Sequence, residues 1–293
     1  MVLEWLKALL WGLIEGVTEW LPVSSTGHLI LFESLFPFAF CSDRDLLAEF
    51  CEMLEVVIQL GAILAVVVLF WKRLFPFSKE QTSVQRGGIR SLWLRLAIAS
   101  IPAALVGTVG DRLLEKCSGR DIDGWLYNAP TVALMLVLYG IAFLLVERNA
   151  KKRGQNNQTV EMISYRTATL IGCFQALSIV PGTSRSGATI LGAILVGTSR
   201  TAAAEFSFFL AIPAMVGASA IKILGFVGYL QQSCVSVPID AWIVLTVGCV
   251  TSFLVSMVAI RFLTDFVKRH SFAAFGVYRI VLGAVVLLWW LIK

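Results

Sequence analysis

The segment EGVTEWLPVSSTGH, residues 15–28, decides the fold because its acids, hydroxyls and histidine interrupt a strongly apolar sequence. A second polar segment, QALSIVPGTSRSGAT at residues 175–189, matches it at an offset of 160 residues, so that Ser184 falls on Ser24. A proline lies close to each of these serines. Charged and polar side chains are costly at hydrocarbon depth, and their usual explanation there is a functional site. Two matching segments therefore predict one site that is built from two halves.

The composition of the chain indicates a membrane protein. Its 293 residues are 58% hydrophobic and only 15% charged, with a mean hydropathy of +0.82. No soluble domain of this length needs so much apolar surface. The apolar residues run continuously instead of alternating, which argues against a β-barrel. We therefore expect an all-α polytopic membrane protein. Six transmembrane spans of the length that a bilayer requires are predicted at about residues 54–71, 96–113, 128–146, 204–224, 241–261 and 273–292.

The charges of the loops predict which side of the membrane each loop faces. The loops 72–95 and 147–166 are rich in Lys and Arg, which is typical of cytoplasmic loops. The segments 33–53 and 225–240 contain almost no basic residues and should face outward. Because the basic residues gather in short loops, the net charge of +5 does not indicate a nucleic-acid partner.

The number of crossings predicts that two segments enter the membrane and return on the same side. Between the inward loop 147–166 and the outward segment 225–240 the chain must cross an odd number of times. The span 204–224 supplies one crossing, so the segment 167–199 must go in and come back. It is long enough for two half-length helices, broken at its proline, but not for two full spans. The segment 1–32 is broken at a proline in the same way.

The two halves of the chain are predicted to form an inverted-topology repeat. We assign residues 1–150 to the first repeat and residues 160–293 to the second, within one integral membrane domain. Each repeat has one re-entrant helix pair followed by three spans. The first starts outside and the second inside, so the broken helices should meet near the midplane. Non-helical backbone is tolerated there only where protein or a wet cavity covers it.

The acids of the first segment suit a divalent cation. Glu15 and Glu19 are four residues apart, so on a helix both carboxylates lie on one face. Their charges repel unless protons or a cation lie between them. Mg²⁺ shared with a substrate phosphate is the expected ion, and Ca²⁺ is an alternative. The purely structural explanation is a solvated helix end with one protonated carboxyl.

The hydroxyls that follow Pro22 have two interpretations. Ser24, Ser25 and Thr26 stand where a helix should start, and capping is the simpler role for Ser24 and Thr26. A helix N-terminus is also a ready anion site. His28 lies three residues after Ser25 on the same helix face, which offers a base to a hydroxyl nucleophile. The alternative for His28 is a satisfied core histidine.

The second segment supplies the positive partner. Arg185 presents a guanidinium fork beside another predicted helix start, together with the hydroxyls of Ser184, Ser186 and Thr189. Such a fork holds a phosphate by two parallel hydrogen bonds. The alternative is an ion pair with the acids of the first segment. Both explanations hold if that pair opens when substrate arrives.

The two segments closely resemble the signature motifs of the undecaprenyl-diphosphatase family, the bacitracin-resistance membrane phosphatases of bacteria. The resemblance covers essentially the whole chain, including MLEVVIQLGAILAVV around residues 54–68 and AAAEFSFFLAIPAMVGA at Ala202–Ala218. It implies an inverted repeat with re-entrant helices. It also implies hydrolysis of the C55 polyprenyl diphosphate to its monophosphate, which recycles the lipid carrier for peptidoglycan and other envelope glycans.

Residue by residue, the resemblance implies the following roles. The acidic motif, which supports a divalent cation and activation, is Glu15 and Glu19. The nucleophile is Ser25, with His28 beside it. The diphosphate-binding residues are Ser184, Arg185 and Thr189. The site should be reached from the periplasmic side of the bacterial inner membrane, and the group that takes the nucleophile's proton stays open.

A transporter is the alternative function. An inverted repeat with broken helices is transporter architecture, and the same residues could bind and move a polyprenyl phosphate or a phospholipid. The combination of hydroxyls, a histidine and paired acids favours an enzyme, because a carrier that only binds phosphate does not require it. The prenyl chain length and the choice between a monomer and a homodimer stay open.

Overall fold

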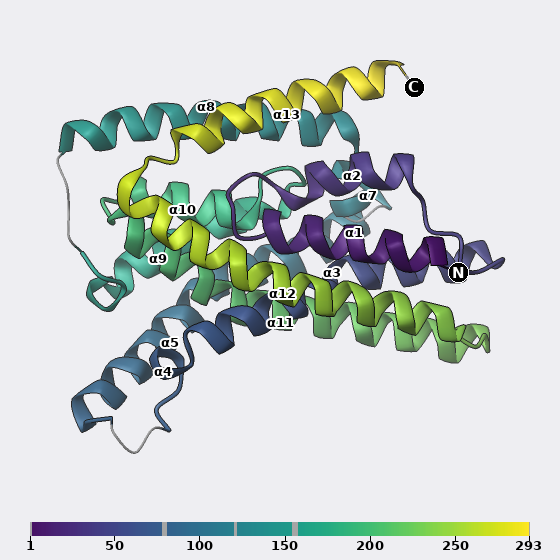
Figure 1. The fold of residues 1–293 in the computed structure, drawn as a ribbon, viewed down its shortest axis with the longest axis horizontal. Helices are drawn as coiled ribbons and strands as arrows, with labels where there is room; N and C mark the ends of the chain where they lie inside the picture. The colour runs from purple at the N-terminus through teal and green to yellow at the C-terminus, as the bar shows by residue number, and fades with distance from the viewer. Residues whose placement is uncertain (1, 78–80, 120–121, 154–157, 293) are drawn as a thin grey trace.

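The fold is that of a computed structural model, which describes residues 2–77, 81–119, 122–153 and 158–292. Within these ranges all regular secondary structure is helical (Figure 1). The helices in chain order are α1 (Val2–Thr18), α2 (Ser25–Leu35), α3 (Arg44–Leu69), α4 (Trp71–Leu74), α5 (Ser83–Leu105), the π-helical turn η1 (Val106–Gly110), α6 (Asp111–Ser118), α7 (Ile122–Leu126), α8 (Ala129–Arg153), the short 3₁₀ turn η2 (Val160–Met162), α9 (Tyr165–Ala176), a second 3₁₀ turn η3 (Leu177–Ile179), α10 (Arg185–Leu195), α11 (Arg200–Ser233), α12 (Ile239–Arg269) and α13 (Ala273–Ile292).

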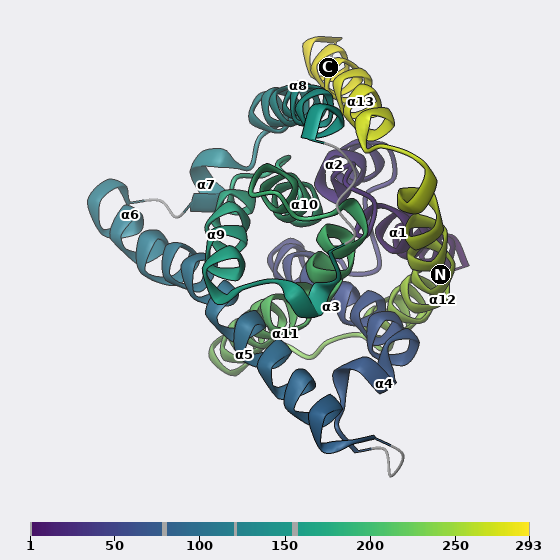
Figure 2. The same ribbon diagram turned by 90° about the vertical axis from the view of Figure 1, so that its left-hand side faces the viewer.

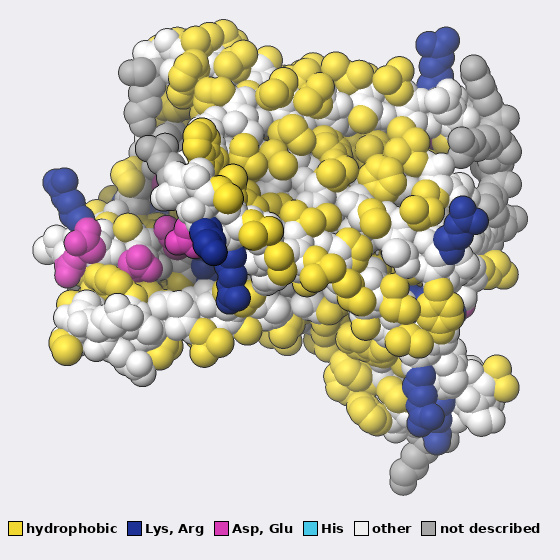
Figure 3. Space-filling model, turned by 180° about the vertical axis from the view of Figure 1, so that it is seen from behind, with side chains coloured by type: hydrophobic (Ala, Val, Ile, Leu, Met, Phe, Trp, Pro, Cys, Tyr) yellow, Lys and Arg dark blue, Asp and Glu magenta, His cyan; other side chains and the backbone are white. Residues whose placement is uncertain are grey.

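Six helices of the described ranges are long and apolar enough to cross a membrane. They are α3, α5 with its continuation through α6, α8, α11, α12 and α13. Their number confirms the six predicted spans and the prediction of an all-α multi-pass membrane protein. Figure 3 shows hydrophobic side chains over most of one face, whereas the charged side chains gather toward its sides. A broad apolar exterior of this kind suits contact with lipid.

Several spans extend beyond their predicted ends. Helix α3 begins at Arg44 instead of near residue 54, and α11 continues to Ser233 instead of ending near residue 224. Local hydrogen bonds explain part of the extension, because the Asp43 carboxylate caps the first turn of α3. Helix α5 likewise starts early, with a capping box formed by Thr82 and Gln85. The predictions followed the apolar residues alone and therefore missed these capped polar turns.

The polar segments lie in two short helix pairs, α1–α2 and α9–α10. The turns between the helices of each pair have similar structures. Helices α2 and α10 each have eleven residues, and each follows a turn that contains a proline. The residue before each helix is the matching serine, Ser24 or Ser184. Both serines have a positive φ, 76° and 68° respectively, which is uncommon for any residue other than glycine. The sequence match between the segments is therefore also a match of backbone conformation.

The packing of the helices relates the two halves of the chain to one another. Helix α1 lies along α12, and its counterpart α9 lies along α5. Helix α3 packs against α11, and α8 packs against α13. If each helix is replaced by its counterpart in the other half, the same set of contacts results. This arrangement supports the predicted repeat, whereas the repeat boundaries at 1–150 and 160–293 and the entry of the pairs from opposite faces of a bilayer stay predictions.

Glycines make two equivalent helix contacts close. A Cβ on Gly12 of α1 would collide with the carbonyl oxygen of Gly248 in α12. A Cβ on Gly172 of α9 would collide with the carbonyl oxygen of Ala99 in α5. Gly12 and Gly172 are themselves separated by the offset of 160 residues. The equivalent glycine of each short pair therefore lets the pair pack closely against the backbone of a long helix.

The two pairs reach the middle of the molecule from its two ends (Figure 1). Helices α1 and α2 lie toward the end that carries the N-terminus, and α9 and α10 lie toward the other end. Viewed along its length, the molecule has α10 and α1 near its centre, with α8 and α13 along one edge (Figure 2). The turns of the two pairs therefore meet inside the protein, where they form the site.

Candidate active site

The turns of the two helix pairs are joined by an ion pair. Arg185, the first residue of α10, donates from Nη2 to Oε1 of Glu19 at 3.0 Å and from Nε to the same oxygen at 3.2 Å. Both side chains are at most 10% exposed. The structure thus brings together the acid of the first segment and the cation of the second. The ion pair that the sequence offered as an explanation for Arg185 is present.

The third nitrogen of Arg185 bonds a residue of α11. Nη1 donates to the Ser207 carbonyl oxygen of α11 at 2.7 Å and lies 3.4 Å from the Ser207 hydroxyl. The guanidinium carbon lies 5.8 Å from the centre of the Trp20 ring. These contacts fix the plane of the guanidinium. A phosphate that binds two adjacent nitrogens of Arg185 by parallel hydrogen bonds must therefore replace at least one of the present partners.

Glu19 also contacts the candidate nucleophile. The Ser25 hydroxyl donates to Oε2 of Glu19 at 3.4 Å, so the carboxylate lies between Ser25 and Arg185. Ser25 is the first residue of α2, where the free amide groups and the positive end of the helix dipole favour an anion. A carboxylate, a hydroxyl and a guanidinium are therefore adjacent.

His28 is directed away from Ser25, toward α13. Its Nδ1 lies 2.7 Å from the Ser24 carbonyl oxygen and its Nε2 lies 2.7 Å from the Tyr278 hydroxyl. A carbonyl oxygen only accepts, so Nδ1 carries the hydrogen and a neutral ring accepts from Tyr278 at Nε2. The rings of His28 and Tyr278 stack with centroids 5.7 Å apart. The predicted pairing of His28 with Ser25 is not observed, and the Ser25 hydroxyl instead bonds Glu19.

Glu15 is fully buried, and neither of its carboxylate oxygens has a hydrogen-bond partner among the described residues. Its charged neighbours include Glu19, Glu55 and Arg185. A buried carboxylate without donors beside a second carboxylate fits a hard divalent cation, which prefers oxygen ligands. The described residues contain no group of three or more His, Cys, Asp or Glu side chains placed to hold a metal. Glu15 and Glu19 therefore fit a cation that takes its other ligands from substrate and water.

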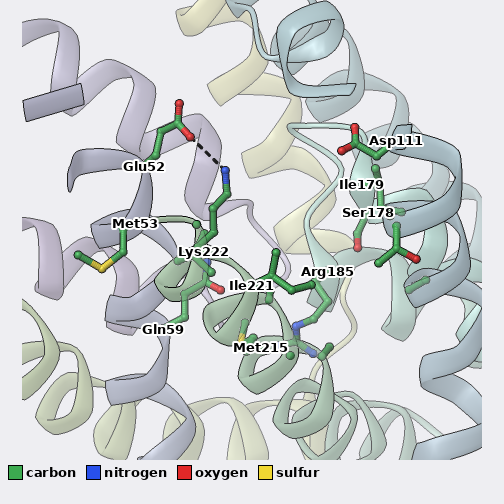
Figure 4. A pocket seen from close by; sticks show the side chains of 18 of the residues that line it. Glu52, Met53, Gln59, Asp111, Ser178, Ile179, Arg185, Met215, Ile221 and Lys222 are labelled. Carbon is green, nitrogen blue, oxygen red and sulfur yellow. Dashed lines mark hydrogen bonds and ion pairs between the residues drawn. The ribbon is translucent and has the colours of Figure 1, made fainter. Parts of the chain in front are cut away.

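A pocket of about 1080 Å³ opens onto this arrangement. At its polar end it is lined by five of the predicted site residues, which are Glu19, Ser25, Thr26, Ser184 and Arg185. Its walls come from α3, α11 and the α5–α6 region and are mostly apolar or small, with Met53, Met215 and Ile221 among them. Figure 4 shows Glu52 of α3 and Lys222 of α11, which are 3.1 Å apart, across the pocket from Asp111.

The other predicted site residues lie behind the pocket wall. The Thr189 hydroxyl is buried and bonds the Ser207 hydroxyl at 2.7 Å, and Ser186 Oγ donates to the Leu21 carbonyl oxygen at 3.4 Å. The predicted capping role of Ser24 is wrong, because its buried hydroxyl has no partner among the described residues. Its counterpart Ser184 does cap, accepting from the Gly187 amide. The hydroxyls of Thr189 and Ser186 therefore stabilise the start of α10 and its contact with the first turn, and they do not line the pocket.

Sequence reasoning missed several residues of the site region. Gln175 and Ser178 line the pocket, and the side-chain amide of the buried Gln175 has no partner among the described residues. Gln175 matches Glu15 in the overlay of the two segments, which was the available signal. On α13, Tyr278 contacts His28 of α2, and Arg279 contacts both turns. Arg279 interrupts an apolar predicted span, so the cost of a buried charge could have identified it.

The chain is similar to known proteins over its whole length. A family model described as "Bacitracin resistance protein BacA" matches residues 8–285. A protein named undecaprenyl-diphosphatase from Acetivibrio thermocellus is 47% identical over 99% of this chain and 99% of its own length. Proteins of the same name from Enterococcus faecalis and Streptococcus agalactiae are 46% and 48% identical, over 98% and 100% of this chain and 97% and 98% of their own lengths. The chain therefore belongs to the BacA bacitracin resistance family, as its two polar segments indicated.

Proposed function

We propose that this protein is a membrane phosphatase that hydrolyses undecaprenyl diphosphate to undecaprenyl phosphate and inorganic phosphate. The observation that carries the proposal is the adjacency of Glu19, Ser25 and Arg185 at the polar end of one pocket. Phosphoryl transfer requires mainly positioning and charge compensation, which these groups supply. The names of the relatives support the same substrate. The reaction would return the lipid carrier to cell-wall synthesis and confer resistance to bacitracin.

In the proposed reaction the Ser25 Oγ attacks the terminal phosphorus, and Oε2 of Glu19 takes the hydroxyl proton. The bond from that phosphorus to the bridging oxygen breaks, and undecaprenyl phosphate leaves with the electron pair. Water then hydrolyses the phosphoserine and releases inorganic phosphate. The alternative is direct attack by a water that Glu19 or His28 activates, without a covalent intermediate.

The charge of the diphosphate is offset from both halves of the protein. Arg185 exchanges Glu19 for phosphate oxygens, and the hydroxyls of Thr26 and Ser184 line the same end of the pocket. A divalent cation, Mg²⁺ or alternatively Ca²⁺, held by Glu15 and Glu19 would neutralise phosphate charge when bound. Ser186 and Thr189 do not line the pocket and act by holding the turns.

The proposed location is the bacterial inner membrane, with the pocket open to the periplasm. The pocket wall extends to Glu49 and Gln232, which lie in segments predicted to face outward. The apolar and small residues between that mouth and Arg185 suit the first isoprene units of the lipid, while the rest of the prenyl chain lies in the bilayer. Such a site takes its substrate from the outer leaflet.

Lipid transport by the same site is the second candidate. The contacts that map one half of the chain onto the other are compatible with the predicted inverted repeat, an arrangement common among transporters. Transport alone leaves the contact of Ser25 with Glu19 without a role. The phosphatase is therefore favoured, and movement of the lipid would be an additional activity.

Phosphate release tests the proposal. Purified protein in detergent with Mg²⁺ should release inorganic phosphate from undecaprenyl diphosphate, and a chelator should abolish release until Mg²⁺ is restored. Ser25→Ala should lower kcat by about 100-fold or more, because the attacking oxygen is lost. Ser233→Ala, which removes an exposed hydroxyl at the end of α11, is the control. Full turnover by Ser25→Ala would exclude the covalent step, and absence of release by the wild type would refute the phosphatase.

A further inference from the structure

Arg279 in the middle of α13 binds both turns at once. Its side chain is fully buried. Nη2 donates to the carbonyl oxygens of Gly182 at 2.8 Å and Thr183 at 2.9 Å, and Nη1 donates to that of Pro22 at 3.3 Å. Pro22 and Gly182 are separated by the offset of 160 residues, so they are the same position of the two turns. One guanidinium therefore joins equivalent backbone atoms of both halves.

Burial of the Arg279 side chain has an unfavourable free energy. Its described hydrogen bonds go to neutral carbonyl oxygens, and its Nε has no partner among the described residues. The guanidinium carbon lies 5.5 Å from the centre of the Tyr139 ring, which adds a cation–π contact. A buried charge without a carboxylate partner is costly in a membrane protein. The hydrogen bonds of Arg279 to both turns explain why a buried arginine is retained at this position.

The carbonyls that Arg279 binds flank the two strained serines. Pro22 and Gly182 each stand two residues before a serine with positive φ, Ser24 or Ser184. Such conformations persist only where the surroundings enforce them. Arg279 thus holds the backbone where each turn leaves ordinary geometry, directly before the first residues of α2 and α10.

The ion pair between Glu19 and Arg185 is the link between the turns that a phosphate can replace. Glu19 accepts from Nε and Nη2 of Arg185, the two nitrogens of one edge of the guanidinium. When phosphate takes those donors, the described hydrogen bonds that still join the turns are those of Arg279 and the 3.4 Å bond of Ser186 to the Leu21 carbonyl oxygen. The bonds of Arg279 do not involve substrate-binding atoms, so they persist through that exchange.

We propose that Arg279 is a positioning residue that keeps Ser25 and Glu19 of one turn at a fixed distance from Arg185 of the other. It acts through the carbonyl oxygens of the turns and does not touch the substrate. Gly187 provides the space, because a Cβ there would lie 3.0 Å from Nη1 of Arg279. The inference rests on the proposed phosphatase activity for its kinetic test, and a distance measurement tests it independently.

The kinetic experiment compares Arg279→Lys and Arg279→Met with Arg261→Lys, which changes an exposed arginine of α12. Lys keeps the charge but cannot bind carbonyls of both turns from one planar group. Both Arg279 variants should lose about 100-fold in kcat/KM, as expected for a displacement of reacting groups. Recovery of wild-type turnover by Arg279→Lys would reduce the role to charge alone and overturn the proposal.

A double-variant cycle separates positioning from general destabilisation. Arg185→Lys combined with Arg279→Lys should be no slower than Arg185→Lys alone, because Arg279 acts through the placement of Arg185. Multiplied losses would indicate independent effects and contradict the proposal. If the Arg279 variants do not fold, Gly187→Ala perturbs the same guanidinium without removing it and should cost about tenfold; an unchanged rate would count against the role.

The distance between the turns is the readout that needs no catalysis. Nitroxide labels on cysteines placed at Leu35 and Leu195, the exposed last residues of α2 and α10, report their separation in a background without the native cysteines. The wild type should give a narrow distance distribution and Arg279→Met a broad or shifted one. Identical distributions would overturn the inference, even in a preparation that releases no phosphate.

Discussion

At the scale of single residues, Ser24 and Ser184 share a backbone conformation but use their hydroxyls differently. Both have positive φ, yet Ser184 caps α10 whereas the buried Ser24 hydroxyl has no partner among the described residues. A conformation of this kind costs about 1–3 kcal/mol in a residue other than glycine. An unpaired buried hydroxyl adds a further cost. Their retention at the start of α2 suggests that Ser24 serves the substrate or the placement of Ser25.

Ser24→Gly should therefore stabilise the protein. Glycine adopts positive φ without strain and removes the unpaired hydroxyl, so we expect a gain of about 1 kcal/mol after the entropy cost of glycine. Ser184→Gly is the matched control, and its gain should be smaller because the cap to the Gly187 amide is lost. The free energy of unfolding in detergent is the measurement. A loss of stability in Ser24→Gly would show that the hydroxyl has a structural partner.

At the scale of elements, each short helix pair is seated by a glycine against a long helix of the other half. Gly172 of α9 leaves room for the Ala99 carbonyl oxygen of α5, and Gly12 of α1 does so for Gly248 of α12. These contacts set the depth of both turns, and thus the separation of Glu19 from Arg185. Close packing of backbones is also what stabilises helices in lipid, where the hydrophobic effect between helices is absent.

Gly172→Ala should destabilise the protein by about 1–3 kcal/mol, because the added methyl group overlaps a backbone carbonyl that cannot move alone. Gly87→Ala is the control, since nothing lies within 4 Å of a Cβ at that exposed position of α5. It should be neutral or slightly stabilising, in accord with helix propensity. Thermal unfolding in detergent distinguishes the two variants. Equal midpoints would mean that α9 is not seated by this contact.

At the scale of the whole molecule, the loops at one end are rich in basic residues and the loops at the other end are poor in them. The loops predicted to be cytoplasmic adjoin α4, α8 and α9 at one end, and those predicted to face outward adjoin α2, α3, α11 and α12 at the other (Figure 1). The pocket mouth belongs to the second group of segments. The orientation of the protein in the membrane therefore decides which compartment supplies the substrate.

Cysteine labelling tests that orientation. In a background without native cysteines, a membrane-impermeant thiol reagent added outside should label Ser233→Cys and should not label Val84→Cys, although both positions are exposed. Permeabilised cells, in which both should react, provide the control. Labelling of Val84→Cys alone in intact cells would reverse the orientation and place the pocket mouth in the cytoplasm.

The sequence predicted the features that carry a large energetic cost. Acids and an arginine at hydrocarbon depth identified Glu19, Ser25 and Arg185, and the structure brings them together. It could not predict partners across helices: His28 turned out to bind Tyr278 instead of Ser25, because spacing along one helix does not fix a rotamer. Arg279 was recognisable as a charge within an apolar span, but the backbone carbonyls that it binds could not be identified from the sequence.

Helix α1 packs on α12, and α9 packs on α5, so each half of the chain depends on the other half for its packing. Either half alone would leave the glycine-containing faces of its short helices without the backbone that they pack against. Because α1 packs against α12, the first helix to be synthesised can reach its native contact only after most of the chain has left the ribosome.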